Sequence, residues 1–178
     1  NSTCKNCNDP LNGNFCSNCG QSSHSDRIDM HYISHEIQHG IFHVDKGILY
    51  TIKELAIHPG KMLREYLKGK RVKHFKPFGF VVILASLYGL LAHYFHLYPD
   101  LSFLESPDNV AYTKKYNEWV YTHYSLFSLL CTPVYAFFSY LVFKKLAYNY
   151  LEHLIINLYI TGFQIAIGIC ILPLHYFF

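Results

Sequence analysis

The sequence predicts an all-α integral membrane protein, in which about three transmembrane helices follow amphipathic interfacial helices and a small cysteine-rich ribbon. Of the 178 residues, 51% are hydrophobic and only 15% are charged, which is too little charge to cover a soluble domain of this size. The apolar residues crowd into the second half of the chain, and four cysteines lie near its start. We therefore expect a ribbon (1–22), amphipathic helices (28–76) and a transmembrane bundle (77–178).

Three stretches without Asp, Glu, Lys or Arg are long enough to cross a bilayer. They are residues 78–98, 119–143 and 154–178, each 21 to 25 residues long, and about 20 apolar residues span a bilayer core. Basic residues precede the first stretch and follow the second, which predicts a cytoplasmic N-terminus. The chain has no initiator methionine and ends within an apolar run, so we expect it to be a fragment of a slightly longer protein.

A few polar residues interrupt these stretches and are expected to face another helix or water, because a polar group in lipid is costly. They are His93, His96, His123, Asn157, Gln164 and His175. The simplest role for them is hydrogen bonding between helices. The alternative is an oligomeric pore or proton path, for which His93, His96 and His123 would have to line a wet interior.

Two C-x2-C pairs occupy the N-terminus, Cys4 with Cys7 and Cys16 with Cys19. Thiolates at this spacing converge on one tetrahedral ion, and the asparagines and glycines around them suit the turns of such knuckles. A disulfide is the competing interpretation, but cytoplasmic thiols stay reduced. The pattern predicts a zinc ribbon whose ion is structural, because four thiolate ligands leave no open position for catalysis.

A polar linker (21–27) follows, and then a segment of helical period with one apolar face and one histidine face. The simplest interpretation is an amphipathic helix on the inner leaflet. The segment also contains H-E-x-x-H, in which His35 and His39 would bind zinc and Glu36 would act as general base. A third ligand could come from His43 if the helix breaks at Gly40, or from Asp45, His58 or a transmembrane histidine that folds back. A second metal site at this histidine stripe is therefore an open alternative.

A basic collar precedes the first apolar stretch, on two short amphipathic helices that meet at residues 59–60. It comprises Lys61, Arg64, Lys68, Lys70, Arg71, Lys73 and Lys76. Each basic side chain near a membrane surface attracts anionic headgroups with about 1 kcal/mol, so we expect a lipid bilayer as a partner. Nucleic acid is not expected, because the ribbon itself is not notably basic.

Several short motifs are spread over the ribbon and the collar: FCSNCGQ (15–21), VDKG (44–47), TIKEL (51–55), HPG (58–60) and REYLKGKR (64–71). They resemble an uncharacterised bacterial family of zinc-ribbon inner-membrane proteins, a domain of unknown function. The likeness covers about residues 4–85. It implies a cytoplasmic ribbon ahead of a helical bundle in the bacterial inner (cytoplasmic) membrane, and it implies no activity.

The sequence favours an accessory, docking or assembly subunit of a larger membrane complex. Three spans are few for a self-contained transporter, a closed metal site suits contacts, and no catalytic set is complete. The partners would be other membrane subunits or further copies of the chain. The alternative from another class is a membrane-embedded zinc-dependent hydrolase that uses the H-E-x-x-H at residues 35–39.

Overall fold

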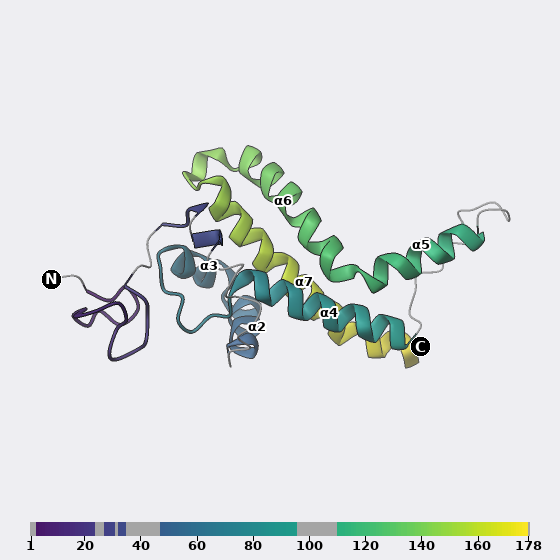
Figure 1. Cartoon of the computed structure of the whole chain (residues 1–178), viewed down its shortest axis with the longest axis horizontal. Helices are drawn as coiled ribbons and strands as arrows, with labels where there is room; N and C mark the ends of the chain where they lie inside the picture. The colour runs from purple at the N-terminus through teal and green to yellow at the C-terminus, as the bar shows by residue number, and fades with distance from the viewer. Residues whose placement is uncertain (1–2, 24–26, 31, 35–46, 96–109, 178) are drawn as a thin grey trace.

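The computed structural model describes residues 3–23, 27–30, 32–34, 47–95 and 110–177, and within these residues it contains helices and no named strand. Three long helices lie side by side, the ribbon lies beyond one end of them, and α5 extends from the other end (Figure 1). The elements are α2 (Ile48–Ile57), α3 (Pro59–Leu67), α4 (Pro77–Tyr94), α5 (Val110–Thr122), α6 (Tyr124–Val142), the short 3-10 helix η2 (Lys144–Leu146) and α7 (Tyr150–Phe177).

The predicted fold class is confirmed. The described residues form helices and no named strand, and α4, α6 and α7 are each long and apolar enough to cross a membrane. The boundaries differ from the prediction at three places, the first of which is the end of α4 at Tyr94 instead of residue 98. Residues 119–122 belong to α5 and not to the second long helix, and α7 begins at Tyr150, ahead of the predicted start at residue 154. The division into three parts stays a prediction.

Helix α7 begins early because of a reciprocal cap. The side-chain oxygen of Asn149 accepts the N–H of Glu152 at 2.8 Å, and the carboxylate of Glu152 accepts the N–H of Asn149 at 2.7 Å. This is a capping box, with asparagine at the N-cap and glutamate three residues later. Glu152, whose charge excluded it from the predicted apolar stretch, therefore belongs to the first turn of α7 and helps to start the helix.

Helices α4 and α7 approach each other closely at a glycine. A Cβ atom on Gly162 of α7 would lie 2.4 Å from the ring of Phe80 on α4, and Phe80 is completely buried. The glycine therefore lets an aromatic ring lie directly on the backbone of α7. A looser contact of the same kind joins Gly168 and Tyr88, where the distance would be 3.1 Å.

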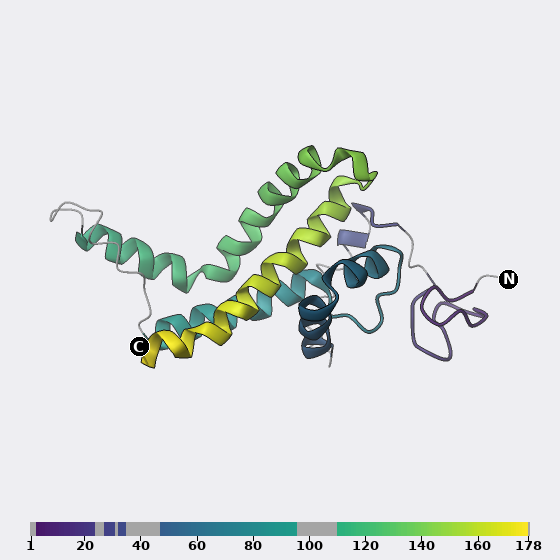
Figure 2. The same ribbon diagram turned by 180° about the vertical axis from the view of Figure 1, so that it is seen from behind.

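Helices α2 and α3 lie at the end of the bundle nearest the ribbon (Figure 2). Leu55 of α2 and Met62 and Tyr66 of α3 are buried in the same hydrophobic core as Phe80 and Tyr159. The apolar face of α3 thus packs against protein, whereas α2 buries Leu55 and leaves Leu49 and Ile57 exposed. Their predicted place at the membrane surface stays a prediction.

Candidate metal centre

Two equivalent knuckles form the ribbon. In the first, the N–H of Asn8 donates to the carbonyl of Cys4 at 2.8 Å, and the N–H of Cys4 donates to the carbonyl of Asp9 at 2.8 Å. The same pair of hydrogen bonds recurs at Cys16, at 2.9 and 2.8 Å. Asn8 (φ 65°) and its counterpart Gly20 (φ 75°) have left-handed backbone, a conformation that asparagine and glycine tolerate best. The local sequence therefore encodes both turns.

The knuckles bring four sulfur atoms together. The Sγ atoms of Cys4 and Cys19 are 3.5 Å apart, as are those of Cys7 and Cys16, and all four lie within 4.8 Å of one another. Sulfur atoms around one tetrahedral ion, with metal–sulfur bonds of about 2.3 Å, are about 3.8 Å apart. All four cysteines are free thiols. The cluster could therefore hold one metal ion.

The electrostatics of the cluster also suit a cation. The side chain of Asn6 and the backbone amide of Gln21 lower the pKa of Cys19 to about 6. At Cys7 the amide of Asp9 favours the thiolate, but burial and the neighbouring sulfur atoms outweigh it and raise the pKa to about 12. Four thiolates this close repel one another, and a bound cation removes that repulsion.

A buried glutamine joins the second knuckle to the helical body. The side chain of Gln21 is only 4% exposed, and its oxygen accepts the N–H groups of Arg71 and Val72, both at 3.0 Å. Sequence reasoning assigned Gln21 to a linker and missed this contact, because its partners lie about 50 residues away. The metal centre is consequently attached to the turn that follows α3.

The contact continues from that turn into the bundle. The guanidinium of Arg71 lies 4.3 Å from the ring centroid of Tyr32 and 5.6 Å from that of Tyr66, and the two tyrosine hydroxyls are 2.7 Å apart. Tyr66 meets Tyr159 of α7 edge-on, and the hydroxyl of Tyr159 donates to the carbonyl of Phe75 at 2.7 Å. Arg71, which the sequence placed in the collar, therefore has an internal structural role.

A second connection lies just after the ribbon. The guanidinium of Arg27 binds both carboxylate oxygens of Glu152 at 2.9 Å and donates to the carbonyl of Ala147 at 2.9 Å. The side-chain amide of Asn149 donates to the carbonyl of Ile28 at 3.1 Å. These roles of Glu152 were not predicted from the sequence, because the helix was delimited by the absence of charged residues. The signal that could have found it is the N-x-x-E capping pattern at 149–152.

The residues of the predicted second metal site lie outside the described part of the chain. They are His35, Glu36, His39 and His43, together with Asp45. The histidine-stripe metal site and the hydrolase hypothesis therefore stay predictions.

The histidines of the pore hypothesis are placed only in part. His93 and His123 are exposed, and His96 lies outside the described residues. The ring of His123 stacks on Trp119 with centroids 4.8 Å apart, and its Nδ1 lies 2.9 Å from the Trp119 carbonyl. The pore hypothesis stays a prediction.

The fold and the site define a helical protein with three membrane-length helices and a four-cysteine cluster that could hold a metal ion. A family model described as Protein of unknown function (DUF3667) matches residues 45–89, which run from just before α2 into α4. The match supports a relationship to an uncharacterised family, and it begins after the four cysteines. No curated protein and no solved structure matches the chain.

Proposed function

We propose that the protein is an accessory, docking or assembly subunit of a larger membrane complex, in which a zinc-stabilised ribbon presents a contact surface. The observation that carries the proposal is the attachment of the metal centre through buried Gln21. A ribbon on a free tether would need no such contact. A ribbon seated on the body has one orientation, which is what a docking surface requires.

The donor set supports zinc as the ion. Four sulfur ligands in tetrahedral proximity are typical of structural zinc, and they leave no position for water or substrate. In this proposal Cys4, Cys7, Cys16 and Cys19 hold the zinc, and the ion stabilises the ribbon without taking part in chemistry.

The arrangement of basic residues supports a cytoplasmic ribbon, and the family resemblance points to the bacterial inner membrane. The ribbon, α3 and the connection between α6 and α7 lie toward the same end of the bundle (Figure 1). Exposed lysines and arginines gather there, on α3, after it and in η2, and such residues stay on the cytoplasmic side. They are Lys61, Arg64, Lys68, Lys73, Lys144 and Lys145. At that height they would also bind anionic headgroups.

The ribbon offers an aromatic side chain to a partner. Phe15 precedes the second knuckle and is 68% exposed, whereas Cys4 and Cys16 are the buried residues of 3–20. Large exposed aromatic side chains are enriched where proteins make contacts. Phe15 is thus the anchor that we assign to the docking surface.

The test is purification of the tagged full chain from its native membranes in mild detergent, with zinc and copurifying proteins quantified per chain. We expect a stoichiometric membrane partner. Cys16→Ser/Cys19→Ser should lose zinc and partner, and Gln21→Ala should keep zinc but weaken the partner about tenfold, since two hydrogen bonds that orient the ribbon are lost.

Ser17→Ala, a change at an exposed position in the same knuckle, is the matched control and should keep both zinc and partner. A wild-type preparation that contains only monomer or homo-oligomer would contradict the proposal. So would a partner that both ribbon variants retain.

A further inference from the structure

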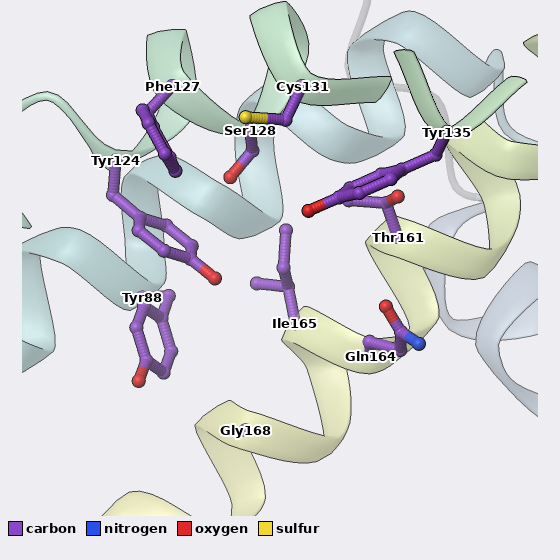
Figure 3. A pocket seen from close by; sticks show the side chains of 10 residues that line it. All are labelled: Tyr88, Tyr124, Phe127, Ser128, Cys131, Tyr135, Thr161, Gln164, Ile165 and Gly168. Carbon is purple, nitrogen blue, oxygen red and sulfur yellow. The ribbon is translucent and has the colours of Figure 1, made fainter. Parts of the chain in front are cut away.

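A cavity of about 260 Å³ lies between α4, α6 and α7. It is lined by Tyr88 in the second half of α4, by residues in the first two thirds of α6 and by residues in the middle of α7, so it lies in the half of the bundle farther from the ribbon. Hydroxyl groups reach it from two sides: Tyr124 and Ser128 on one, Tyr135 and Thr161 on the other (Figure 3). Tyr124 and Ser128 also hydrogen-bond to each other, so this pair keeps one hydroxyl proton for a ligand, and the cavity still offers hydrogen bonds at opposite ends.

The lining has no charge. None of the ten lining residues is Asp, Glu, Lys, Arg or His, and all ten belong to the described residues. A charged ligand in a membrane-length bundle would need a countercharge, because a bare charge at this depth is strongly disfavoured. The ligand that suits this cavity is therefore uncharged.

Gln164 provides an observation that does not depend on the size of the cavity. It lies about 20 Å along α7 from Tyr150, where a spanning helix would be in hydrocarbon, yet its side chain is exposed. Among the described residues, its amide has no hydrogen-bond partner. An unpaired amide in hydrocarbon is costly, so a group from outside the chain should bind it.

The size of the cavity limits what enters it. Pockets for drug-sized ligands measure about 300–1,000 Å³, whereas an engineered cavity of about 150 Å³ holds benzene. The present cavity thus fits one substituted six-membered ring, while the rest of a larger molecule stays among the lipid chains. The rings of Tyr124 and Tyr135 provide aromatic faces against which a planar ring can pack.

We propose that this cavity binds the ring of a lipid-soluble quinone or quinol, with its oxygens hydrogen-bonded to the hydroxyls at the two ends of the cavity and to the amide of Gln164. Such a ring is planar and uncharged, has oxygens on opposite sides and carries an apolar tail. The proposal concerns binding and includes no electron transfer. It does not rest on the metal centre or on the docking role, so each can fail without the other.

The test uses the full chain in lipid nanodiscs and decylubiquinone, whose ring has no free position for thiol addition. Cys131 lines the cavity, and Cys170 is an exposed thiol farther along α7. Alkylation of each thiol by N-ethylmaleimide is followed by peptide mass spectrometry. At a concentration about ten times Kd, the probe should slow alkylation of Cys131 about tenfold and leave Cys170 unchanged. Decylbenzene, which lacks the ring oxygens, should protect neither thiol.

Two variants test the polar contacts. Tyr135→Phe and Gln164→Leu should each raise the decylubiquinone concentration for half-protection about 2- to 10-fold, because each removes one hydrogen bond. Tyr140→Phe is the matched control for Tyr135→Phe. It also removes a tyrosine hydroxyl from α6, but Tyr140 does not line the cavity, so this variant should behave like the wild type. The protection assay on the unchanged chain stands even if a variant fails to fold.

Three results would overturn the proposal. The first is no protection of Cys131 by decylubiquinone. The second is equal protection of Cys170, or equal protection by decylbenzene, which would mean partition into lipid only. The third is protection without any probe that disappears when the protein is diluted in lipid, because a second copy of the chain would then cover the cavity.

Discussion

The ribbon and the helical bundle are held together by different interactions. Within residues 3–20 only Cys4 and Cys16 are buried, so the ribbon has no apolar core and its structure depends on two turns and four sulfur atoms. The bundle depends on close contacts between distant residues, such as Phe80 against Gly162. One chain therefore contains two sources of stability, the metal-binding sulfur atoms of the ribbon and the helix packing of the bundle, and a substitution can remove either one without the other.

Removal of the metal should have the largest effect, and only on the ribbon. Structural zinc contributes about 10–16 kcal/mol of apparent binding free energy to such sites. In Cys16→Ser/Cys19→Ser we therefore expect the first 20 or so residues to become sensitive to protease, while the helical circular dichroism of the bundle stays unchanged.

Elemental analysis measures the zinc content of the same two proteins. The wild type should contain about one zinc per chain and the double variant none. A zinc that survives in the variant would instead indicate a metal at His35, His39 and His43. A bundle that unfolds together with the ribbon would contradict the independence of the two regions.

The next effect should be confined to the bundle. Gly162→Ala places a methyl group against the ring of Phe80, and overpacking of this kind costs about 1–3 kcal/mol. The melting temperature in detergent should fall, while the zinc content stays the same. Gly168→Ala should cost less, because the edge of Tyr88 lies farther from its new methyl group.

A second substitution, at Phe80, tests whether the loss of stability comes from its contact with residue 162. Phe80→Leu should relieve part of the cost of Gly162→Ala, since the two positions share one contact and their effects are then not additive. Strictly additive losses would show that the steric explanation is wrong.

A smaller effect is expected where the two regions are joined. Glu152→Ala removes the ion pair with Arg27 and one half of the capping box, the bond from the Asn149 N–H, while the bond to the Asn149 side chain remains. The lost half of the box should cost about 1 kcal/mol in addition to the pair. Arg27→Ala removes only the pair. Because 63% of the Arg27 side chain is exposed, its loss should cost at most about 1 kcal/mol. Melting of the two variants in detergent measures the difference, and equal losses would contradict the role of the cap.

The smallest effect should depend on pH. Burial lowers the pKa of His74, outweighing Glu54 and Glu65, which raise it, while Lys73 lowers it further. As pH falls below about 6.5, the unfolded chain binds a proton that the folded chain does not, so the free energy of unfolding decreases.

His74→Phe keeps an aromatic ring beside Tyr50 and Tyr66 and should reduce the difference in melting temperature between pH 7 and pH 5. The comparison belongs in the Cys16→Ser/Cys19→Ser background, where release of metal at low pH does not contribute. An unchanged difference would exclude His74 as its source.

The sequence by itself determined the features that depend on local spacing. Two cysteines three positions apart form a knuckle wherever asparagine and glycine permit the turn, and an uncharged stretch of membrane length forms a long helix because its own backbone satisfies its polar groups. The four-cysteine cluster and the three long helices follow from these local patterns.

Only the tertiary structure decided what joins these features. From the sequence, Gln21 was assigned to a linker, Glu152 was left outside an apolar stretch and Gln164 was assigned to hydrogen bonding between helices. Their roles depend on partners up to 125 residues away or, for Gln164, on a cavity formed by three helices. Local patterns carry no information about such distant neighbours, because packing alone determines which surfaces meet.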